Sequence, residues 1–200
     1  MKILCMDSSH RYLVLGLYEN DKLVAGVSFS AWKKQSETLF PELIKLMKQA
    51  NWESEDIEAI VISDGPGSYT GVRIAMSVAK VFCTTMEIPL YRISTLLLYA
   101  GLKENVLTLL DARSNRAYVG MIHKGKFLKE PCIMTLDELK ELLQETSYEV
   151  VGDRELLNLE TQEVDFLKNF IDLKDQWIKV ENIHTLVPYY LKDQSAYKVK

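Results

Sequence analysis

The stretch Ser63–Ile74, with the sequence Ser-Asp-Gly-Pro-Gly-Ser-Tyr-Thr-Gly-Val-Arg-Ile, constrains the fold of this chain more than any other. A mostly apolar run over residues 57–62 precedes it, and a long apolar segment continues from it to Met86. This order predicts a strand, a tight turn and a helix. Gly65 and Gly67 suit the turn because glycine adopts backbone angles that other residues resist.

We call the central residues of this stretch the motif loop: Gly65, Pro66, Gly67, Ser68, Thr70, Gly71 and Arg73. Ser68 or Thr70 is expected to cap the helix, whose first N–H groups attract anions. Two phosphate-binding patterns nevertheless fail, because the Lys of Gly-x4-Gly-Lys-Ser/Thr is missing and Gly71 comes one position too late for Gly-x-Gly-x-x-Gly. The loop therefore favours a strained turn that begins a buried helix over a phosphate cradle.

Two predicted helices carry more apolar surface than one sheet contact requires. The helix after the motif loop has a narrow polar stripe, made of Arg73, Ser77, Lys80 and Thr84. A helix over residues 36–50, with Ser36 as the candidate cap, has two adjacent apolar stripes at positions 39-43-46 and 40-44-47. A central core position and a partner surface both explain such helices. The candidate interface residues are Leu39, Phe40, Leu43, Met47, Ile74, Val78 and Val81.

Composition narrows the class of protein. The chain has 200 residues, 48% hydrophobic content and a net charge of −4. No basic block and no basic patch interleaved with aromatic residues occurs in it, so the chain alone is a poor candidate for gripping RNA. No apolar stretch reaches the ~18–20 residues of a membrane span, and the short apolar start before Asp7 does not resemble a signal peptide. We expect a cytoplasmic protein without a membrane contact.

The element pattern divides into two similar halves. Strands are expected at residues 2–6, 12–18, 23–29, 59–63, 89–93, 106–110, 117–122, 127–128 and 148–151, and further helices at 94–101 and 135–145. Residues 155–185 allow no assignment, because their apolar positions are sparse. Strands followed by strand–helix units in each half predict two α/β lobes that meet near Gly101.

The chemistry of the strand ends is ambiguous. Asp7 and Ser8 follow the first strand, and Asp111 follows a strand of the second half. Such aspartates either hold a metal-bound nucleotide or cap local turns, and local capping is the commoner role. The three His residues are scattered without metal-ligand spacing, and no nucleophile–base set is recognisable. We expect no catalytic residue, no metal and no cofactor.

Asp64–Ile74 resembles the signature of the TsaB (YeaZ) family, which takes part in making threonylcarbamoyladenosine in tRNA. The resemblance extends to Ile3–Ser9, to Gln35–Pro41, to Asp111-Ala112-Arg113 with Tyr118, and to Pro188–Leu191. It implies a two-lobed actin- and Hsp70-like (ASKHA) α/β fold, with a mixed sheet and helices in each lobe and a reduced second lobe. The implied domains are residues 1–100, to which 190–200 could return, and residues 101–189.

The resemblance also implies a role. Members of this family are non-catalytic dimerisation subunits that pair with a catalytic TsaD subunit through the two helices described above. TsaD transfers a threonylcarbamoyl group to adenosine 37 of ANN-decoding tRNAs, and a TsaE ATPase joins the complex. We therefore expect a homodimer when the chain is alone, tRNA contact only through the complex, and a vestigial nucleotide site at Asp7, Ser8 and Asp111. The alternative is an independent glycopeptidase-like or small-molecule kinase-like enzyme.

Overall fold

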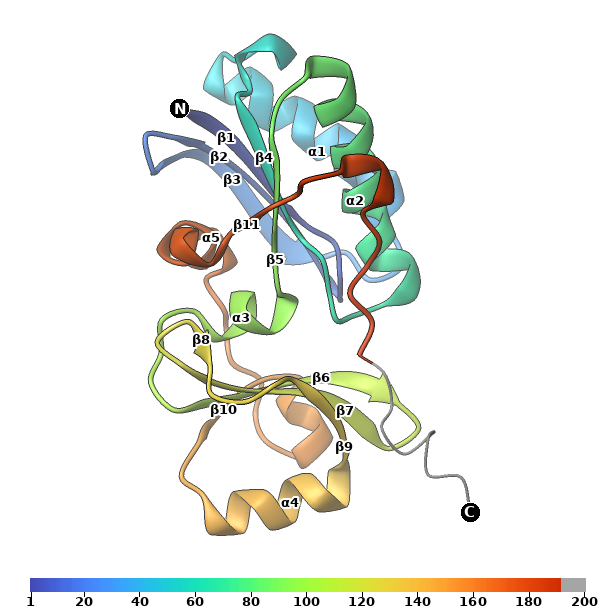
Figure 1. Ribbon diagram of the computed structural model, residues 1–200, viewed down its shortest axis with the longest axis vertical. Helices are drawn as coiled ribbons and strands as arrows, with labels where there is room; N and C mark the ends of the chain where they lie inside the picture. Colours follow the sequence, from blue (N-terminus) through green and yellow to red (C-terminus); the bar gives the residue numbers. More distant parts are fainter. Residues whose placement is uncertain (192–200) are drawn as a thin grey trace.

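The computed structural model describes residues 1–191, which form two lobes stacked along the long axis of the molecule (Figure 1). Each lobe contains a mixed sheet with helices, as predicted, and the second lobe is the smaller. The first sheet has the strand order β11-β5-β4-β1-β2-β3. Its strands are β1 (Lys2–Asp7), β2 (Tyr12–Glu19), β3 (Lys22–Ser30), β4 (Ala59–Ser63), β5 (Leu90–Ile93) and β11 (Ile178–Lys179).

Helices cover both faces of the first sheet, because its central strands are apolar on both sides. On β1, Leu4 and Met6 point into a core shared with α1 (Gln35–Ala50) and α2 (Tyr69–Met86). Ile3 and Cys5 point to the opposite face, where α3 (Thr95–Ala100) and α5 (Phe166–Asp172) lie. This alternation follows from the two-residue period of a strand.

The start of α1 differs from the prediction. The helix begins at Gln35, and Lys34 occupies the capping position without a side-chain hydrogen bond. Ser36 therefore lies inside the helix and does not cap it. Gln35 is buried, and its side-chain amide donates to the carbonyl oxygen of His10 over 2.7 Å. This tertiary hydrogen bond, rather than a local cap, holds the entry to the helix.

The second sheet has the order β10-β6-β7-β8, and β9 also pairs with β7. Its strands are β6 (Val106–Arg113), β7 (Arg116–His123), β8 (Lys126–Phe127), β9 (Cys132–Thr135) and β10 (Glu149–Gly152). The amphipathic helix α4 (Leu136–Glu145) covers one face, and the predicted capping box is confirmed because Thr135 and Glu138 each accept from the other's backbone N–H. Strand β9 was not expected. The fully buried helix α3 packs between the two sheets.

The unassigned segment contains α5, β11 and short 3-10 turns, which are η2 (Arg154–Leu157), η3 (Lys174–Gln176) and η4 (Ile183–Thr185); another, η1 (Ser54–Asp56), precedes β4. Strand β11 pairs antiparallel with the edge strand β5, so this part of the chain returns to the first lobe. This differs from the expected second domain, which ran to residue 189. Free backbone groups on β5 explain the return, since an edge strand offers unpaired donors and acceptors. The boundary near residue 100 stays a prediction, and the expected return of 190–200 lies, from Lys192 on, outside the described residues.

Candidate functional site

The motif loop connects β4 to α2. Ser68 is the cap, because its hydroxyl oxygen accepts from the backbone N–H of Gly71 over 3.3 Å, whereas Thr70 lies exposed in the first turn of the helix. Gly65 has φ +113°, a backbone conformation that favours glycine. The turn-and-helix geometry is therefore the one that the sequence predicted.

The turn after β1 packs directly onto the motif loop. The backbone N–H of Ser68 donates to the carbonyl oxygen of Ser9 over 2.7 Å. A Cβ on Gly67 would lie 2.3 Å from that same oxygen, and a Cβ on Gly71 would lie 2.4 Å from the carbonyl oxygen of Ser8. Two glycines are therefore needed for this close approach, which the sequence patterns did not reveal.

Ser8 joins the same contact from the side of β1. Its hydroxyl donates to the carbonyl oxygen of Gly71 over 2.7 Å and accepts from the N–H of Ala75 over 3.0 Å. Those two backbone groups are four residues apart, so the hydroxyl lies between the partners of a regular helical hydrogen bond. Ser8 thus fastens the start of α2 to the end of β1.

The carboxylates of the two strand-end aspartates, Asp7 and Asp111, both accept hydrogen bonds from nearby groups of this chain. Asp7 is buried and accepts from the backbone N–H of Ser9 over 2.8 Å and from the hydroxyl of Ser63. Asp111 is exposed and accepts from the backbone N–H of Arg113 over 2.7 Å. Both carboxylates therefore cap local turns. The vestigial nucleotide site expected at Asp7, Ser8 and Asp111 stays a prediction.

A charged cluster joins the lobes beside this turn, and sequence reasoning missed its central member, Asp153. Asp153 follows β10 and is buried. His10 Nε2 lies 2.8 Å from its carboxylate, and Arg11 Nη2 also lies 2.8 Å from it. Burial raises the pKa of Asp153, but the hydrogen bonds from His10 and the backbone of Asp111, together with the nearby cations, lower this pKa below its usual value. The sequence signal that could have identified Asp153 is its position soon after the predicted strand at residues 148–151.

The two stripes of α1 have different surroundings. Leu39 is 1% exposed and belongs to the core under the first sheet, so its assignment to a partner surface is corrected. Leu43 is 8% exposed and belongs to the same core, but it also lines the groove described below, and its place in a partner surface stays a prediction. They face inward because the 39-43-46 stripe packs on β2 and β3. In contrast, Phe40 and Ile44 are 55% and 53% exposed. Met47 is half-buried beside them.

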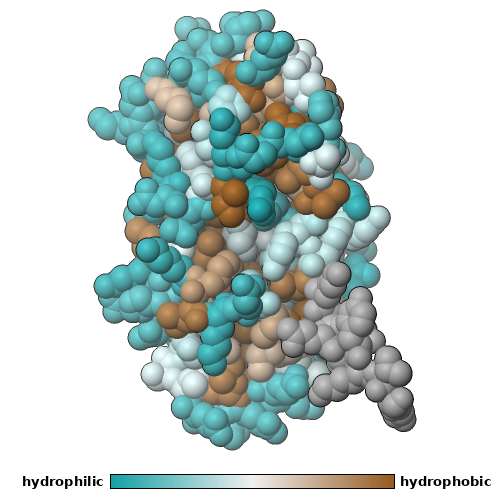
Figure 2. Space-filling view, in the orientation of Figure 1, coloured by the Kyte–Doolittle hydropathy of each residue, from teal (hydrophilic) through white to brown (hydrophobic). Residues whose placement is uncertain are grey.

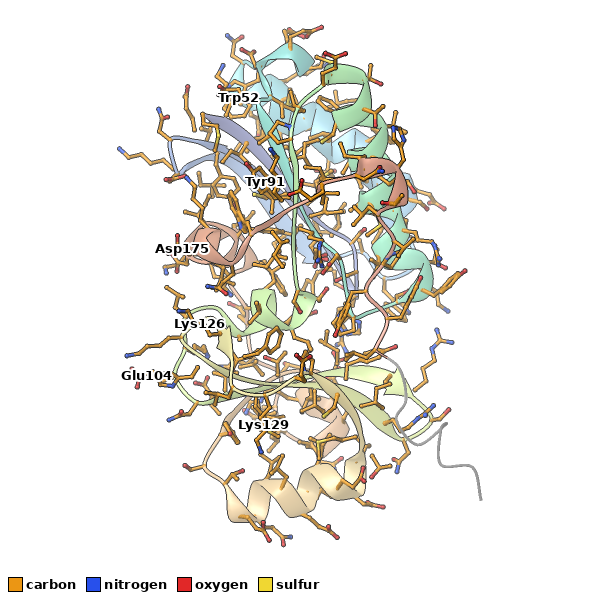
Figure 3. The ribbon with its side chains drawn as sticks, viewed as in Figure 1. Trp52, Tyr91, Glu104, Lys126, Lys129 and Asp175 are labelled. Atoms are coloured by element: carbon orange, nitrogen blue, oxygen red, sulfur yellow. The ribbon has the colours of Figure 1, made fainter. Side chains whose placement is uncertain are left out.

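Helix α2 adds to the same surface. Ile74 and Val78 are half-buried at the edge of the core, and Val81 is exposed. A groove of about 500 Å³ separates α1 from α2, and Phe40, Ile44, Met47, Val78 and Phe82 are among its lining residues. Trp52, at the outer end of the first lobe in Figure 3, also lines this groove. On the face shown in Figure 2, apolar surface also interrupts the hydrophilic exterior beside α2.

Comparison with known proteins identifies the family of this chain. The family model described as "TsaD: tRNA N6-adenosine threonylcarbamoyltransferase" matches residues 29–167, which is more than half of the chain. Relatives named tRNA threonylcarbamoyladenosine biosynthesis protein TsaB accompany this match. The chain belongs to the TsaD family, in its TsaB (YeaZ) group. It is 27% identical to TsaB of Bacillus subtilis, with 96% of this chain and 94% of the relative covered. TsaB of Escherichia coli is 28% identical over 59% of this chain and 53% of the relative.

A solved structure confirms the fold of this TsaB-group chain. The structure titled "YeaZ from Pseudomonas aeruginosa" superposes with a TM-score of 0.73 at 16% identity, covering 95% of this chain and 99% of that one. A second solved chain, described by its similarity to YeaZ from the same organism, gives a TM-score of 0.72. The predicted two-lobed α/β fold, with a mixed sheet and helices in each lobe, is confirmed.

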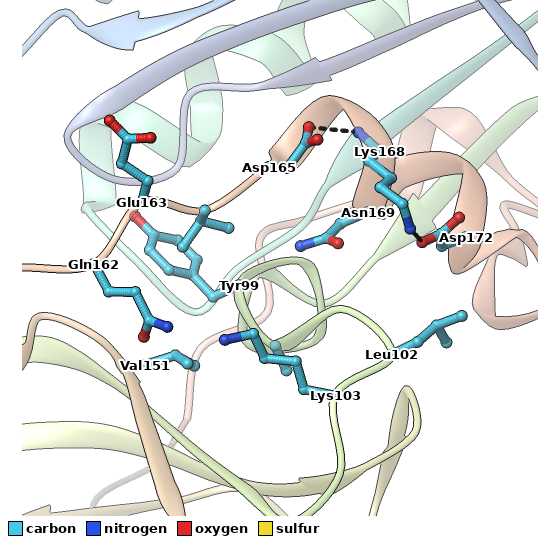
Figure 4. Close-up of a pocket in the computed structure, with 12 residues that line it drawn as sticks. Tyr99, Leu102, Lys103, Val151, Gln162, Glu163, Asp165, Lys168, Asn169 and Asp172 are labelled. Atoms are coloured by element: carbon cyan, nitrogen blue, oxygen red, sulfur yellow. Dashed lines mark hydrogen bonds and ion pairs between the residues drawn. The ribbon is translucent and has the colours of Figure 1, made fainter.

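Three further observations on the TsaB-group chain concern a second hollow, metal-binding side chains and membrane-spanning helices. A hollow of about 410 Å³ lies beside α5, and several of its charged side chains pair within the chain, as Lys168 does with Asp172 (Figure 4). Within residues 1–191 there is no group of three or more His, Cys, Asp or Glu side chains placed to hold a metal ion. Among the described helices, none is long and apolar enough to cross a membrane.

Proposed function

We propose that this chain is a non-catalytic subunit in the biosynthesis of threonylcarbamoyladenosine in tRNA, located in the cytoplasm. Its partner is a TsaD-like catalytic subunit, which transfers the threonylcarbamoyl group to adenosine 37 of ANN-decoding tRNAs. The names of the TsaB relatives support the pathway. A TsaE-like ATPase as a further partner rests on the family resemblance alone.

The exposed second stripe of α1 is the observation that carries the pairing role. Phe40 and Ile44 leave large apolar side chains in solvent, next to the groove that α2 completes. A soluble chain rarely exposes such a continuous apolar surface unless a partner covers it. The first stripe already supplies the core, so folding of this chain does not explain the second.

The polar groups around the motif loop support a scaffold over an independent enzyme. The turn after β1 lies against Gly67 and Gly71 and leaves no cradle for a chain of phosphates at that point. Burial raises the pKa of the Cys83 thiol to about 12, which is the opposite of nucleophile activation. The loop thus acts as a structural joint between β1 and α2.

The test is a charge placed on the exposed stripe. Ile44→Glu should weaken binding to the TsaD-like subunit by at least about a hundredfold, because a carboxylate stranded in an apolar contact costs several kcal/mol. Gln49→Glu is the matched control, since it adds the same charge at an exposed position elsewhere on the helix. Calorimetric titration measures both, with circular dichroism to check folding. Equal affinity of folded Ile44→Glu and the native chain would remove α1 from the interface.

A further inference from the structure

A hollow of about 330 Å³ lies between the two lobes, at the start of α2. Its wall contains five aromatic side chains, which are His10, Trp32, Tyr69, Tyr118 and Tyr190. They come from five places in the chain, namely the turn after β1, the segment before α1, the first turn of α2, strand β7 and the C-terminal segment. The tertiary structure thus assembles an aromatic cleft that no local sequence pattern shows.

Three rings of this aromatic cleft, those of Trp32, Tyr69 and Tyr190, are exposed. Trp32 and Tyr69 are 51% and 66% exposed, although large apolar rings normally avoid water. The rings of Tyr69 and Tyr190 stack with 5.9 Å between their centres and 19° between their planes. Trp32 meets His10 edge to face, with 6.3 Å between ring centres. Flat rings held in fixed orientations offer stacking surface to a planar molecule.

One arginine lines the aromatic cleft, and a second lies against the ring of Tyr69 beside it. The guanidinium carbon of Arg73 lies 3.8 Å from the ring centre of Tyr69, and Arg113 lines the hollow. Among the described lining residues, Asp111 supplies the one carboxylate, and it already accepts the backbone N–H of Arg113. Stacking surface next to arginines fits a nucleobase that carries a phosphate.

We propose that the aromatic cleft binds one unpaired nucleotide of an RNA strand, with the base against Trp32 or Tyr69 and a phosphate toward Arg113. The inference rests on the proposed function, which gives this chain an RNA-modifying complex to serve. It revises the expectation that tRNA is contacted only through the complex, because that expectation came from the charge and motifs of the sequence, which do not show the assembled rings. With a net charge of −4, the chain holds the strand by stacking more than by phosphate contacts.

Fluorescence anisotropy of a labelled, unstructured RNA heptamer, titrated with the full chain at about 50 mM salt, tests this proposal. Whichever of Trp32→Ala and Tyr69→Ala removes the ring that stacks on the base should weaken binding about tenfold, which is the usual loss of one stacked base. Trp32→Phe and Tyr69→Phe keep a ring and should recover most of the affinity. The slope of log affinity against log salt should be no steeper than about −0.7, as expected for one arginine–phosphate contact on a single strand.

Controls separate this site from the pairing surface and from free nucleotides. Phe40→Ala removes an exposed ring on α1 and should leave RNA affinity unchanged, while Trp32→Ala should leave binding to the TsaD-like subunit unchanged. Adenosine monophosphate and inorganic phosphate are the competitors, and each should displace the heptamer only at much higher concentration. Absent RNA binding, unchanged RNA affinity in both alanine variants, or a nucleotide that binds as tightly as the heptamer would overturn the proposal, whatever the outcome with Ile44→Glu.

Discussion

Gly71 lies at the third position of α2 and has no room for a side chain. A glycine inside an exposed helix normally weakens it, so a change to alanine usually adds up to about 1 kcal/mol of stability. Here the added Cβ would meet the carbonyl oxygen of Ser8 at 2.4 Å, and that oxygen belongs to backbone held by Ser8's own hydrogen bonds to α2. The local helix preference therefore predicts that Gly71→Ala raises the free energy of unfolding, whereas the tertiary contact predicts that it lowers it.

We expect the tertiary contact to have the larger effect, so that Gly71→Ala lowers the free energy of unfolding by about 1–3 kcal/mol. Thr70→Ala, at the neighbouring exposed position, should change it by less than about 0.5 kcal/mol. Urea denaturation of both variants measures the difference. A Gly71→Ala variant as stable as the native chain would mean that β1 and α2 separate easily.

Asp153 makes stability depend on pH. An aspartate in the unfolded chain has a pKa of about 3.9, and the pKa of Asp153 in the folded chain is lower. The ionised carboxylate therefore stabilises the fold above the unfolded value, and this contribution disappears as the pH falls through the folded pKa. Asp153→Asn should lose about 2 kcal/mol at pH 7, and the gap to the native chain should shrink toward pH 3.

Unfolding free energies measured between pH 3 and 7 check this prediction. Glu160→Gln, which changes an exposed carboxylate nearby in sequence, should follow the native profile. A gap between Asp153→Asn and the native chain that stays constant with pH would show that geometry, rather than ionisation, is what the substitution removes.

At the scale of elements, three sides of helix α2 have different surroundings. One side packs on the sheet through Val72, Ala75 and Ala79, and a second borders the groove with α1. The third carries the predicted polar stripe, along which the C-terminal segment runs (Figure 1). Lys80 on this stripe donates to the carbonyl oxygens of His184 and Leu186, each over 3.0 Å. A helix that is apolar nearly all round is thus covered partly by its own chain.

Removing this lysine should loosen the C-terminal segment without unfolding the lobe. In Lys80→Ala, backbone amides between residues 183 and 190 should exchange with solvent about tenfold faster, because two hydrogen bonds that hold the segment are lost. Ser77→Ala, on the same stripe, is the control. Exchange that accelerates equally across the first sheet would indicate global destabilisation instead.

At the scale of the whole molecule, one apolar surface has two possible occupants. A stable interface buries roughly 800 Å² on each partner, and a patch of that size on a free chain favours self-association. A second copy and the TsaD-like subunit would then compete for the groove between α1 and α2. We therefore predict that pairing and self-association use the same exposed stripe.

The isolated chain should therefore sediment as a homodimer that the TsaD-like subunit converts to a one-to-one heterodimer. Ile44→Glu should sediment as a folded monomer, and Gln49→Glu as a dimer. Analytical ultracentrifugation distinguishes these states. A complex with two copies of this chain bound to one TsaD-like subunit would contradict competition, because it would need two separate surfaces.

Much of the site could be predicted from local patterns. The strand, turn and helix around the motif loop, the Ser68 cap and the Thr135–Glu138 capping box each depend on residues close in sequence. Residues 155–185 could not be assigned, because α5 and β11 are short and stabilised by contacts with α3 and β5 rather than by their own periodicity. Asp153 was missed for the same reason, since its partners His10 and Arg11 are far away in sequence.

The sequence by itself determined that α1 has two apolar stripes and that the motif loop starts a helix, because helical period and glycine geometry are local properties. It did not determine which stripe faces the sheet. Only the tertiary structure buried Leu39 and Leu43 and left Phe40 and Ile44 in solvent, since the path of the chain sets how a helix is rotated on its sheet. The aromatic cleft depends on the structure in the same way, because rings from five segments meet only after both lobes have packed around α3.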